Sequence, residues 1–325
     1  MKDTQSDGRS QLVTMGETLA SMCSLEPLPL RQASRFDLSI AGAESNVAIG
    51  AARLGIRTSW IGRVGDDELG HLIVNKMRGE DLDVRAQFDV EHPTVLMLKS
   101  RRTSSIQNVD YYRRESAGSH LSTADIDVAL ISCADVFHVS AITSALSKDA
   151  RDAVRSAIST AKRAGTQVSI DLNYRSALWS REEAAPEFRF LAGAADFLFC
   201  TVSEAQIVAQ GDDPVSLARQ LAEYGAGQVV VKQGSDGAIS WRDGKSSVVK
   251  PIPVSAFDEV GAGDAFAAGF LASLIAGGDP DRNLAWAAAM GAWAVSTRGD
   301  WEGLPTLDEL FDSLRHNQTS DSVVR

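Results

Sequence analysis

Three observations predict an α/β fold with a mainly parallel sheet. From residue 125 onward, short apolar runs typical of strands alternate with longer amphipathic stretches typical of helices, which is the pattern of βαβ units. Residues Gln228–Lys232 form a continuous apolar run, which suits a strand buried on both faces. The chain has 325 residues, of which 44% are hydrophobic, enough for one large α/β domain or a domain with a small appendage.

Charge and cysteine content narrow the class of protein. The formal net charge is −11, the isoelectric point is near 5.0, and there is no long basic run, which argues against nucleic acid as a partner. Because the net charge repels anions, local arginines would have to hold any anionic substrate. The three cysteines are scattered without metal-binding spacing, the first ten residues have no apolar core, and no apolar run could span a bilayer. We therefore expect a cytoplasmic protein without a membrane partner.

The N-terminal part begins with a strand over Leu12–Met15 that ends at Gly16 and Glu17, where a glycine lets the backbone approach a ligand. A proline-containing stretch and a short strand over residues 38–40 follow. Residues 42–55 are expected to form a loop and then a helix. Asn46 falls in the first turn of this helix, where it either faces a ligand or caps the helix. A strand over 58–61 and a helix over 70–77 come next.

Residues 95–99 and 109–113 predict two strands joined by a polar turn. Because side chains alternate along a strand, Tyr111 and Arg113 share one face. An aromatic hydroxyl beside a guanidinium suits a carboxylate and its neighbouring hydroxyls, since arginine grips a carboxylate with two parallel hydrogen bonds. A solvated basic strand pair is the alternative.

From residue 125 onward, where predicted strands and helices alternate, polar residues follow the strands. Strands are expected over 134–139, 167–172, 195–200 and Gln228–Lys232, and helices over Lys148–Ala164, 283–296 and 307–314. Ligands bind at the carboxyl ends of the strands in such sheets. Asn173 and Arg175 follow one of these strands, and residues 233–237 follow another, although the second segment also suits a plain β-turn. His138, alone at a strand end, is expected to be structural.

The most informative motif is the glycine-rich turn Gly261-Ala262-Gly263-Asp264. Apolar residues recur after it with helical spacing, so the turn leads into a helix N-terminus. Unpaired N–H groups and the helix dipole favour an anion at such a turn. Asp264 would repel a resting phosphate but would accept a proton from a hydroxyl that attacks one. The alternative is a helix cap whose glycines only close the turn.

Residues 258–266, which include this turn, resemble the C-terminal signature of the ribokinase-like (PfkB) carbohydrate kinases. Residues 41–48, with residues 62–67 after them, resemble the N-terminal signature of that family. Two signatures in the right order are more specific than either alone, and the resemblance extends from about residue 12 to about residue 314. It implies a single ribokinase-like kinase domain over residues 1–325, with a three-layer α/β/α fold, a mainly parallel central sheet and a small β-sheet lid drawn from about 17–41 and 94–114. Residues 1–10 and 316–325 are expected to be disordered tails.

The resemblance also implies roles for individual residues. The amides of Gly261, Ala262 and Gly263 would form the anion hole for the transferred phosphoryl group, and Asp264 would be the catalytic base that contacts the sugar hydroxyl. The strings over 111–119 and 171–175 resemble the 2-keto-3-deoxygluconate kinase branch. The remaining residues expected to contact the sugar acid are Gly42, Asn46, Tyr111, Arg113 and Arg175. Those expected to contact ATP are Asn173, Arg175, Lys232, Gly234, Ser235, Gly237, Gly261, Gly263 and Ala288. Glu204 is expected to hold Mg²⁺ through water.

We therefore predict an ATP- and magnesium-dependent kinase that phosphorylates the terminal hydroxyl of 2-keto-3-deoxygluconate and forms a dimer through its lid. Three positions depart from the family pattern: Thr201 and Ala288 stand where asparagine is usual, and Met97 where some relatives are aromatic. A fructokinase- or ribokinase-type kinase of a neutral sugar is the first alternative. Arg113 argues against it, because it would face a neutral sugar unpaired. A non-catalytic sugar or nucleotide sensor on the same scaffold is the second alternative, and the presence of Asp264 and the glycines argues against that one.

Overall fold

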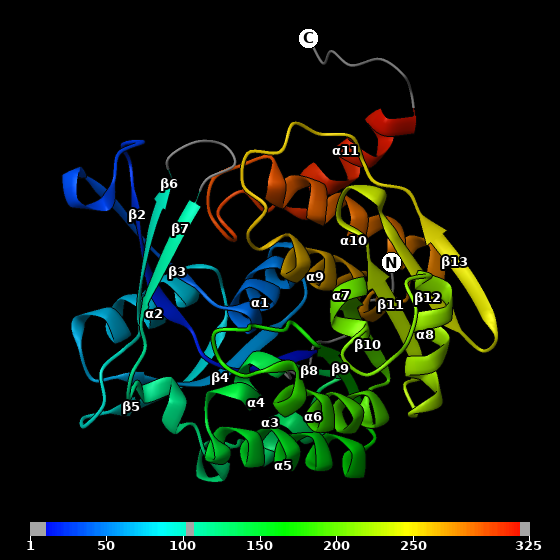
Figure 1. Cartoon of the computed structure of the whole chain (residues 1–325), viewed down its shortest axis with the longest axis horizontal. Coiled ribbons are helices and arrows are strands. Elements are labelled where there is room, and N and C mark those ends of the chain that lie inside the picture. Colours follow the sequence, from blue (N-terminus) through cyan, green and yellow to red (C-terminus); the bar gives the residue numbers. More distant parts are fainter. Residues whose placement is uncertain (1–10, 102–106, 319–325) are drawn as a thin grey trace, which may run out of the picture.

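A nine-stranded sheet runs through the middle of the computed structural model, which describes residues 11–101 and 107–318 (Figure 1). In spatial order its strands are β13 (Lys245–Val249), β12 (Ala238–Arg242), β11 (Gln228–Lys232), β10 (Phe197–Thr201), β9 (Gln167–Asp171), β8 (Val136–Ser140), β1 (Leu12–Met15), β4 (Thr58–Gly65) and β5 (Asp83–Asp89). All neighbouring pairs from β11 to β5 are parallel, and the last two strands, β12 and β13, pair antiparallel at one edge.

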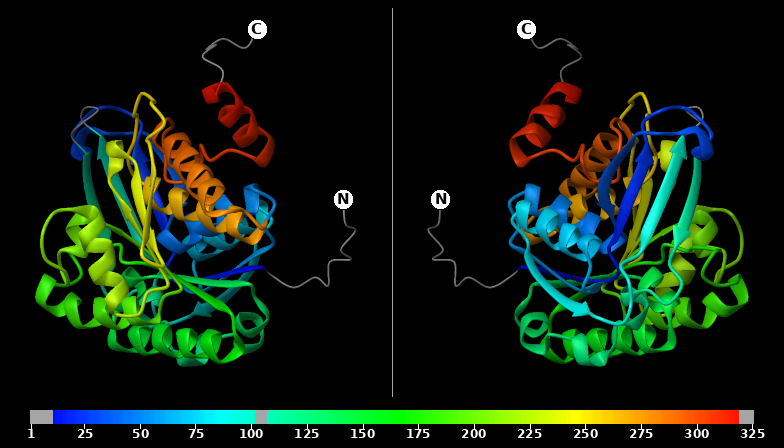
Figure 2. Two further views of the ribbon diagram at one scale, coloured as in Figure 1. Left: turned by 90° about the vertical axis from the view of Figure 1, so that its right-hand side faces the viewer. Right: turned by 90° about the vertical axis from the view of Figure 1, so that its left-hand side faces the viewer.

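Helices cover both faces of this sheet (Figure 2). On one face lie α1 (Ala43–Arg53), α2 (Glu68–Gly79), α9 (Ala262–Ile275), α10 (Pro280–Val295) and α11 (Leu307–Gln318). On the other lie α3 (Val128–Cys133), α4 (Ala141–Leu146), α5 (Lys148–Ala164), α6 (Arg181–Ala194), α7 (Val202–Ala205) and α8 (Pro214–Glu223). The sheet separates two hydrophobic cores, one under each layer of helices. Side chains alternate along β10, so Phe197 and Phe199 enter the first core, and Leu198 and Cys200 enter the second.

A second, four-stranded sheet forms the lid, at the upper left of Figure 1. Its strands, in spatial order, are β3 (Phe36–Ala41), β2 (Leu19–Ser24), β6 (Leu96–Arg101) and β7 (Gln107–Tyr112). The outer pairs are antiparallel, whereas β2 and β6 are parallel. In the register of β6 and β7, Met97 stands opposite Tyr111, so both side chains lie on one face of the lid.

Helix α9 is buried on nearly all sides, with every residue from 265 to 273 enclosed between the sheet, α1 and α10. Its contact with α1 depends on Gly50, because a β-carbon built there would lie only 2.8 Å from Cβ of Ala268. Asn46 precedes Gly50 by one helical turn, and Asp264 precedes Ala268 by one turn. The same close packing therefore brings Asn46 beside Asp264.

The fold class expected from the sequence is confirmed, and β1, α5 and β11 have the predicted bounds. The strand β5, the helices α6 and α8 and the hairpin of β12 and β13 were not anticipated. β5 is an edge strand with mostly polar or exposed residues, so it has no apolar run, and α6 contains Pro186. A disordered tail was expected from residue 316, but helix α11 continues to Gln318. Residues 1–10 and 319–325, the rest of the two predicted tails, lie outside the described residues. Within the described ranges, no helix has the length and hydropathy needed to cross a membrane.

Candidate active site

A cavity of about 760 Å³ opens where β9, β10 and β11 end and α9 begins. Such a position, at the carboxyl ends of parallel strands, is where α/β proteins bind their ligands. The residues that line it are Asn173, Arg175, Thr201, Glu204, Lys232, Gly234, residues 256–261, Gly263 and Asp264. The fold therefore gathers the glycine-rich turn and most of the expected ATP contacts around one space.

Asp264 lies in the first turn of α9, and both its carboxylate oxygens face side-chain amides. Nδ2 of Asn46 donates to Oδ2 at 2.8 Å, and Nδ2 of Asn173 donates to Oδ1 at 3.4 Å. Burial raises the pKa of Asp264 to about 7; the hydrogen bond from Asn46 opposes this rise and the nearby Asp171 adds to it. A carboxyl group whose pKa lies near neutral pH is suited to take up a proton and release it again.

Gly261 opens the turn with a φ of +81°, in the left-handed region that favours glycine. A β-carbon built there would lie 2.2 Å from the carbonyl oxygen of Asp300, so the position has no room for a side chain. The amides of Ala262 and Gly263 belong to the first turn of α9 and have no acceptor one turn earlier in the helix. Among the described residues, the amide of Ala262 makes a long hydrogen bond of 3.4 Å to the carbonyl of Glu259. The turn thus presents backbone donors to an anion.

Lys232, the last residue of β11, places a positive charge beside this turn. Its Nζ pairs with Asp171 at the end of β9, and a β-carbon built on Gly263 would lie 3.2 Å from the same nitrogen. Burial would lower the pKa of this ammonium group, but attraction by Asp171 and Glu204 outweighs burial and raises it above its ordinary value. Lys232 is therefore charged at neutral pH. Its pairing with Asp171 joins two strands that are distant in sequence, and sequence analysis missed it.

Glu204 is held by two backbone amides. Oε2 accepts from the N–H of Thr201 at 2.7 Å, and Oε1 from the N–H of Tyr174 at 2.9 Å. Oγ1 of Thr201 accepts in return from the N–H of Glu204, which completes a capping box at the start of α7. Thr-x-x-Glu is the sequence signature of this motif, so the sequence alone is enough to predict this capping box. Each carboxylate oxygen of Glu204 keeps a further lone pair.

On the lid side, Arg113 pairs with Glu17, which sequence analysis did not single out as its partner. Nη2 of Arg113 is 2.9 Å from Oε2 of Glu17, and its guanidinium lies over the ring of Tyr111 at 5.0 Å from the centroid. Burial raises the pKa of Glu17 above its ordinary value, although Arg113 and the hydroxyl of Ser116 oppose the rise. Gly42 adjoins the same group, because a β-carbon on it would lie 2.6 Å from the carbonyl oxygen of Glu17.

The lid also reaches the glycine-rich turn through a buried ion pair. Lys99 of β6 pairs with Asp300, whose backbone carbonyl packs against Gly261, and both side chains are less than a tenth exposed. Burial raises the pKa of Asp300, and the charge of Lys99 opposes this. The sequence did not predict this pairing.

Three expected ATP contacts lie outside the residues that line the cavity. Ser235 is exposed in a 3₁₀ turn over Gly234–Asp236, and Gly237, with a φ of +91°, closes the connection between β11 and β12. Ala288 is half-buried on α10. His138 is buried in β8, where its Nδ1 is 2.9 Å from Oγ of Ser169 and burial lowers its pKa to about 3, which fits the expected structural role.

The family model of the pfkB family carbohydrate kinases matches residues 10–307 of this chain. A Thermoproteus tenax protein named 2-dehydro-3-deoxygluconokinase is 38% identical over 309 residues, which cover 94% of this chain and 94% of that protein. A protein of the same name from Bacillus subtilis (strain 168) is 34% identical over 311 residues, covering 94% of this chain and 96% of the relative. Among solved structures, an Escherichia coli protein in complex with ATP and Mg²⁺ has a TM-score of 0.88 at 25% identity, covering 95% of this chain and 99% of its own. Because the family model and both relatives extend over most of the chain, this protein belongs to the pfkB family of carbohydrate kinases, enzymes that transfer a phosphoryl group from ATP to a sugar.

Proposed function

We propose that this protein phosphorylates 2-keto-3-deoxygluconate at its terminal hydroxyl to give 2-keto-3-deoxy-6-phosphogluconate. The observation that carries the proposal is the buried carboxyl group of Asp264, whose pKa is raised to about 7 where α9 begins at the cavity. A base with this pKa suits the removal of a proton from an alcohol. The names of the relatives from Thermoproteus tenax and Bacillus subtilis support the sugar acid, which those names describe as 2-dehydro-3-deoxygluconate.

In the proposed reaction, the terminal hydroxyl oxygen attacks the γ-phosphorus of ATP while its proton passes to Asp264. The bond between this oxygen and phosphorus forms as the bond from phosphorus to the β–γ bridging oxygen breaks, and ADP leaves with the electron pair. The amides of Ala262 and Gly263 donate to the moving phosphoryl group together with that of Gly261, and Lys232 offsets its negative charge.

Asn46 would serve both the base and the sugar. Its Nδ2 holds Asp264, and its Oδ1 is buried with no hydrogen-bond partner among the described residues. A buried polar atom without a partner is costly, and a sugar hydroxyl is a donor that would satisfy it. This orphaned oxygen supports a hydroxyl-bearing substrate next to Asp264.

The oxygen atoms that Glu204 and Thr201 present to the cavity fit magnesium. Mg²⁺ takes oxygen ligands and keeps several of its waters, and Glu204 and Thr201 present a carboxylate and a hydroxyl to the cavity. Since each oxygen of Glu204 already accepts one backbone N–H, we propose that Glu204 holds the ion through water. When bound with ATP, Mg²⁺ neutralises charge on the β- and γ-phosphates.

The lid supports a sugar acid less directly than the sequence suggested. Glu17 neutralises Arg113, so the argument that a neutral sugar would leave this arginine unpaired was wrong. A carboxylate is still favoured by the buried Nε of Arg113, which has no partner in the described part of the chain, and by the exposed Arg175 at the cavity. A fructokinase- or ribokinase-type kinase of a neutral sugar is the second candidate, because Glu17 and Arg113 already form a neutral pair.

A coupled assay of ADP release tests the proposal. ATP and Mg²⁺ would be supplied with 2-keto-3-deoxygluconate, fructose, ribose or a nucleoside. Selective turnover of the sugar acid is the expected result. Turnover of fructose or ribose alone would establish the second candidate, and no turnover with any acceptor would refute both.

We also propose a homodimer formed through the lid. The strand register aligns Leu38, Met22 and Leu98 in a row across the outer face of the lid, and Tyr112 projects from the same face. Leu38 is 40% exposed and Tyr112 is 63% exposed, so this face presents apolar surface that a second copy would cover. Sedimentation should show a dimer that Leu38→Glu converts to a monomer, whereas a monomeric wild type would refute the proposal.

For its location we propose the cytoplasm. The thiols of Cys23, Cys133 and Cys200 are not joined in disulfides, as expected in a reducing compartment. Fractionation of cells that produce the protein is the direct test.

A further inference from the structure

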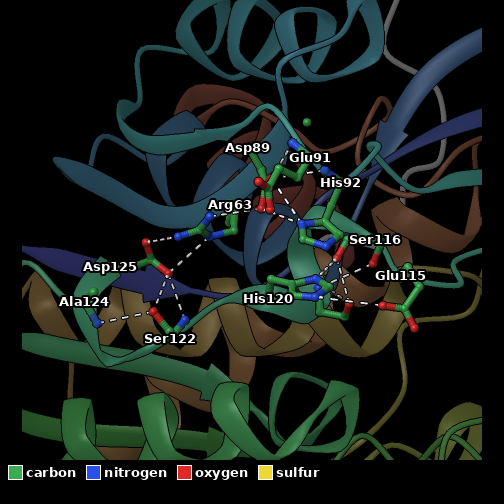
Figure 3. A network of polar contacts seen from close by, with 12 residues as sticks. Arg63, Asp89, Glu91, His92, Glu115, Ser116, His120, Ser122, Ala124 and Asp125 are labelled. Atoms are coloured by element: carbon green, nitrogen blue, oxygen red, sulfur yellow. Dashed lines mark hydrogen bonds and ion pairs between the residues drawn. The ribbon is translucent and has the colours of Figure 1, made fainter.

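We propose a second metal site, for a divalent transition cation such as Zn²⁺, at the base of the lid. His92, Glu115 and His120, here called the lid-base cluster, offer one ring nitrogen each and one carboxylate oxygen within 4.8 Å of one another (Figure 3). The cluster is separate from the residues that line the active-site cavity. Two imidazoles and a carboxylate, with water as a fourth ligand, suit Zn²⁺ and its first-row neighbours, whereas Mg²⁺ prefers oxygen ligands.

Each histidine of the cluster has its Nδ1 held by an oxygen that can only accept a hydrogen bond. Nδ1 of His92 is 3.1 Å from both carboxylate oxygens of Asp89, and Nδ1 of His120 is 3.0 Å from the carbonyl oxygen of Ser116. The neutral rings therefore carry their protons on Nδ1 and keep the lone pair on Nε2. Histidines that bind metals are typically oriented in this way, by an oxygen acceptor on the other ring nitrogen.

Asp89 is itself firmly placed, which fixes the ring of His92. It accepts from Nη1 of Arg63 at 3.0 Å and from the backbone amides of Glu91 and His92 at 2.9 and 3.0 Å. Burial alone would raise the pKa of Asp89, but these hydrogen bonds hold it below its ordinary value. Arg63 is anchored in turn by Asp125 at 2.9 Å, so the network in Figure 3 extends into the body of the protein.

A bound cation would draw the cluster together. The rings of His92 and His120 stack with centroids 3.5 Å apart and planes 17° apart, and Nε2 of His120 is 4.0 Å from Oε2 of Glu115. Ligand atoms of a tetrahedral zinc site lie about 3.4 Å from one another. The rings must therefore tilt and Glu115 must move inward. The side chain of Glu115 is 76% exposed, so it has room to do so.

The three ligands come from the two segments that connect the β6–β7 hairpin of the lid to the body. His92 lies between β5 and β6, whereas Glu115 and His120 follow β7, and the N–H of Ala117 bonds to the carbonyl of Pro93 at 2.9 Å. Ser116 extends the connection, because its carbonyl holds His120 and its hydroxyl donates to Glu17, the partner of Arg113. Zn²⁺ at this position would clamp both ends of the β6–β7 hairpin and restrain the movement of this part of the lid.

Isothermal titration calorimetry with Zn²⁺ on the metal-free, tag-free protein is the test, with and without excess Mg²⁺. One Zn²⁺ per chain is expected, undisturbed by Mg²⁺. His92→Ala, His120→Ala and Glu115→Gln should each weaken binding at least ~10-fold. His71→Ala is the matched control, because His71 pairs with Asp66 outside the cluster and should leave binding unchanged. Circular dichroism would confirm that each variant is folded. Because the side chain of Glu115 is exposed, Glu115→Gln tests the site without the risk of misfolding that the histidine variants carry.

The site is refuted if wild-type protein shows no saturable binding, or if His71→Ala weakens binding as much as the cluster variants do. Unchanged binding in Glu115→Gln and in both folded histidine variants would refute it equally. Hydrogen exchange tests the clamp separately: amides over residues 113–120 should exchange more slowly with Zn²⁺ in wild type but not in His120→Ala. Exchange that Zn²⁺ does not alter would remove the effect on the lid. None of these measurements depends on the sugar that the kinase accepts.

Discussion

Nδ2 of Asn46 donates a 2.8 Å hydrogen bond to Oδ2 of Asp264, across two helices that meet where Gly50 packs on Ala268. The bond favours the ionised carboxylate, so it opposes the burial that raises the pKa of Asp264. Burial has the largest effect on the pKa of the proposed base, and this hydrogen bond is the strongest effect that opposes it. The two residues are 218 positions apart in sequence, and close packing of the helices brings them together.

Asp264→Asn should lower kcat at least ~10²-fold while ATP binding is largely kept, as expected for loss of a general base. The same variant should gain thermal stability, and the gain in Tm should be larger at pH 8 than at pH 5. Between pH 3.8 and about pH 7 the folded state binds more protons than the unfolded state, because the pKa of Asp264 is raised on folding. This carboxyl group therefore lowers the free energy of unfolding as the pH rises. Steady-state kinetics and calorimetry measure the two effects. Near-wild-type turnover would remove the assigned role.

In the wild type, kcat/KM should rise with pH and level off above an acid limb near pH 7, because Asp264 must be ionised to accept a proton. Asn46→Leu removes the hydrogen bond with little change in volume, so the acid limb should move to higher pH. A pH profile of kcat/KM for both proteins checks this. An unmoved limb in a folded, active variant would mean that another group titrates.

Gly261→Ala should destabilise the protein by about 3 kcal/mol or more and abolish most turnover. It combines backbone strain at positive φ with a clash against the carbonyl of Asp300. Gly277→Ala, at the other end of α9, is the matched control, because its φ of +73° adds similar strain but a β-carbon there would meet nothing within 4 Å. That variant should lose only about 1 kcal/mol. Denaturant unfolding compares the two variants. Equal losses of unfolding free energy would show that the clash with the carbonyl of Asp300 does not contribute.

Arg113→Ala should raise KM at least ~10-fold for a sugar acid and much less for a neutral sugar, because arginine binds a carboxylate with two charge-assisted hydrogen bonds. Arg114→Ala is the control, since Arg114 is exposed next along the chain and outside the pair with Glu17. Steady-state kinetics with both kinds of sugar is the measurement. Equal rises in KM for the sugar acid and the neutral sugar would mean that Arg113 supports the structure of the lid and does not recognise a carboxylate.

Lys99→Met should lower the free energy of unfolding by about 3–5 kcal/mol, because it leaves the buried carboxylate of Asp300 without its partner. Adding Asp300→Asn should restore part of this loss. Lys148→Met removes an exposed pair with Asp152 and should cost less than about 1 kcal/mol. Urea titrations of the four proteins give the comparison. A loss as small as that of Lys148→Met would show that the Lys99–Asp300 pair contributes little.

Much of the fold was readable from the sequence because local patterns determine it. The apolar run of β11 and the helical period of α5 predicted their bounds, and the glycines at 261 and 263 predicted a turn at the start of a helix. The elements that escaped prediction have weak patterns, such as β5, which is polar and pairs on one side only.

The pairing of charges could not be predicted in the same way. Glu17 neutralises Arg113 and Asp171 pairs with Lys232, yet each pair joins strand ends or loops that only the complete sheet and lid bring together. The sequence identified Arg113 and Lys232 as cations near a ligand, but their partners depend on tertiary structure. A sequence signal for Glu204 did exist, since Thr201-x-x-Glu204 has the form of a capping box.

The contact of Asp300 with both Lys99 and Gly261 bears on how such enzymes can be re-engineered. Moving this lid into a relative would separate Lys99 from Asp300, and a relative's lid without a lysine at this position would leave Asp300 unmatched in this protein. The exchangeable unit is therefore larger than the lid strands and includes the stretch around Asp300. Chimeras that carry both pieces from one parent should fold, whereas those that divide them between parents should accumulate as insoluble protein.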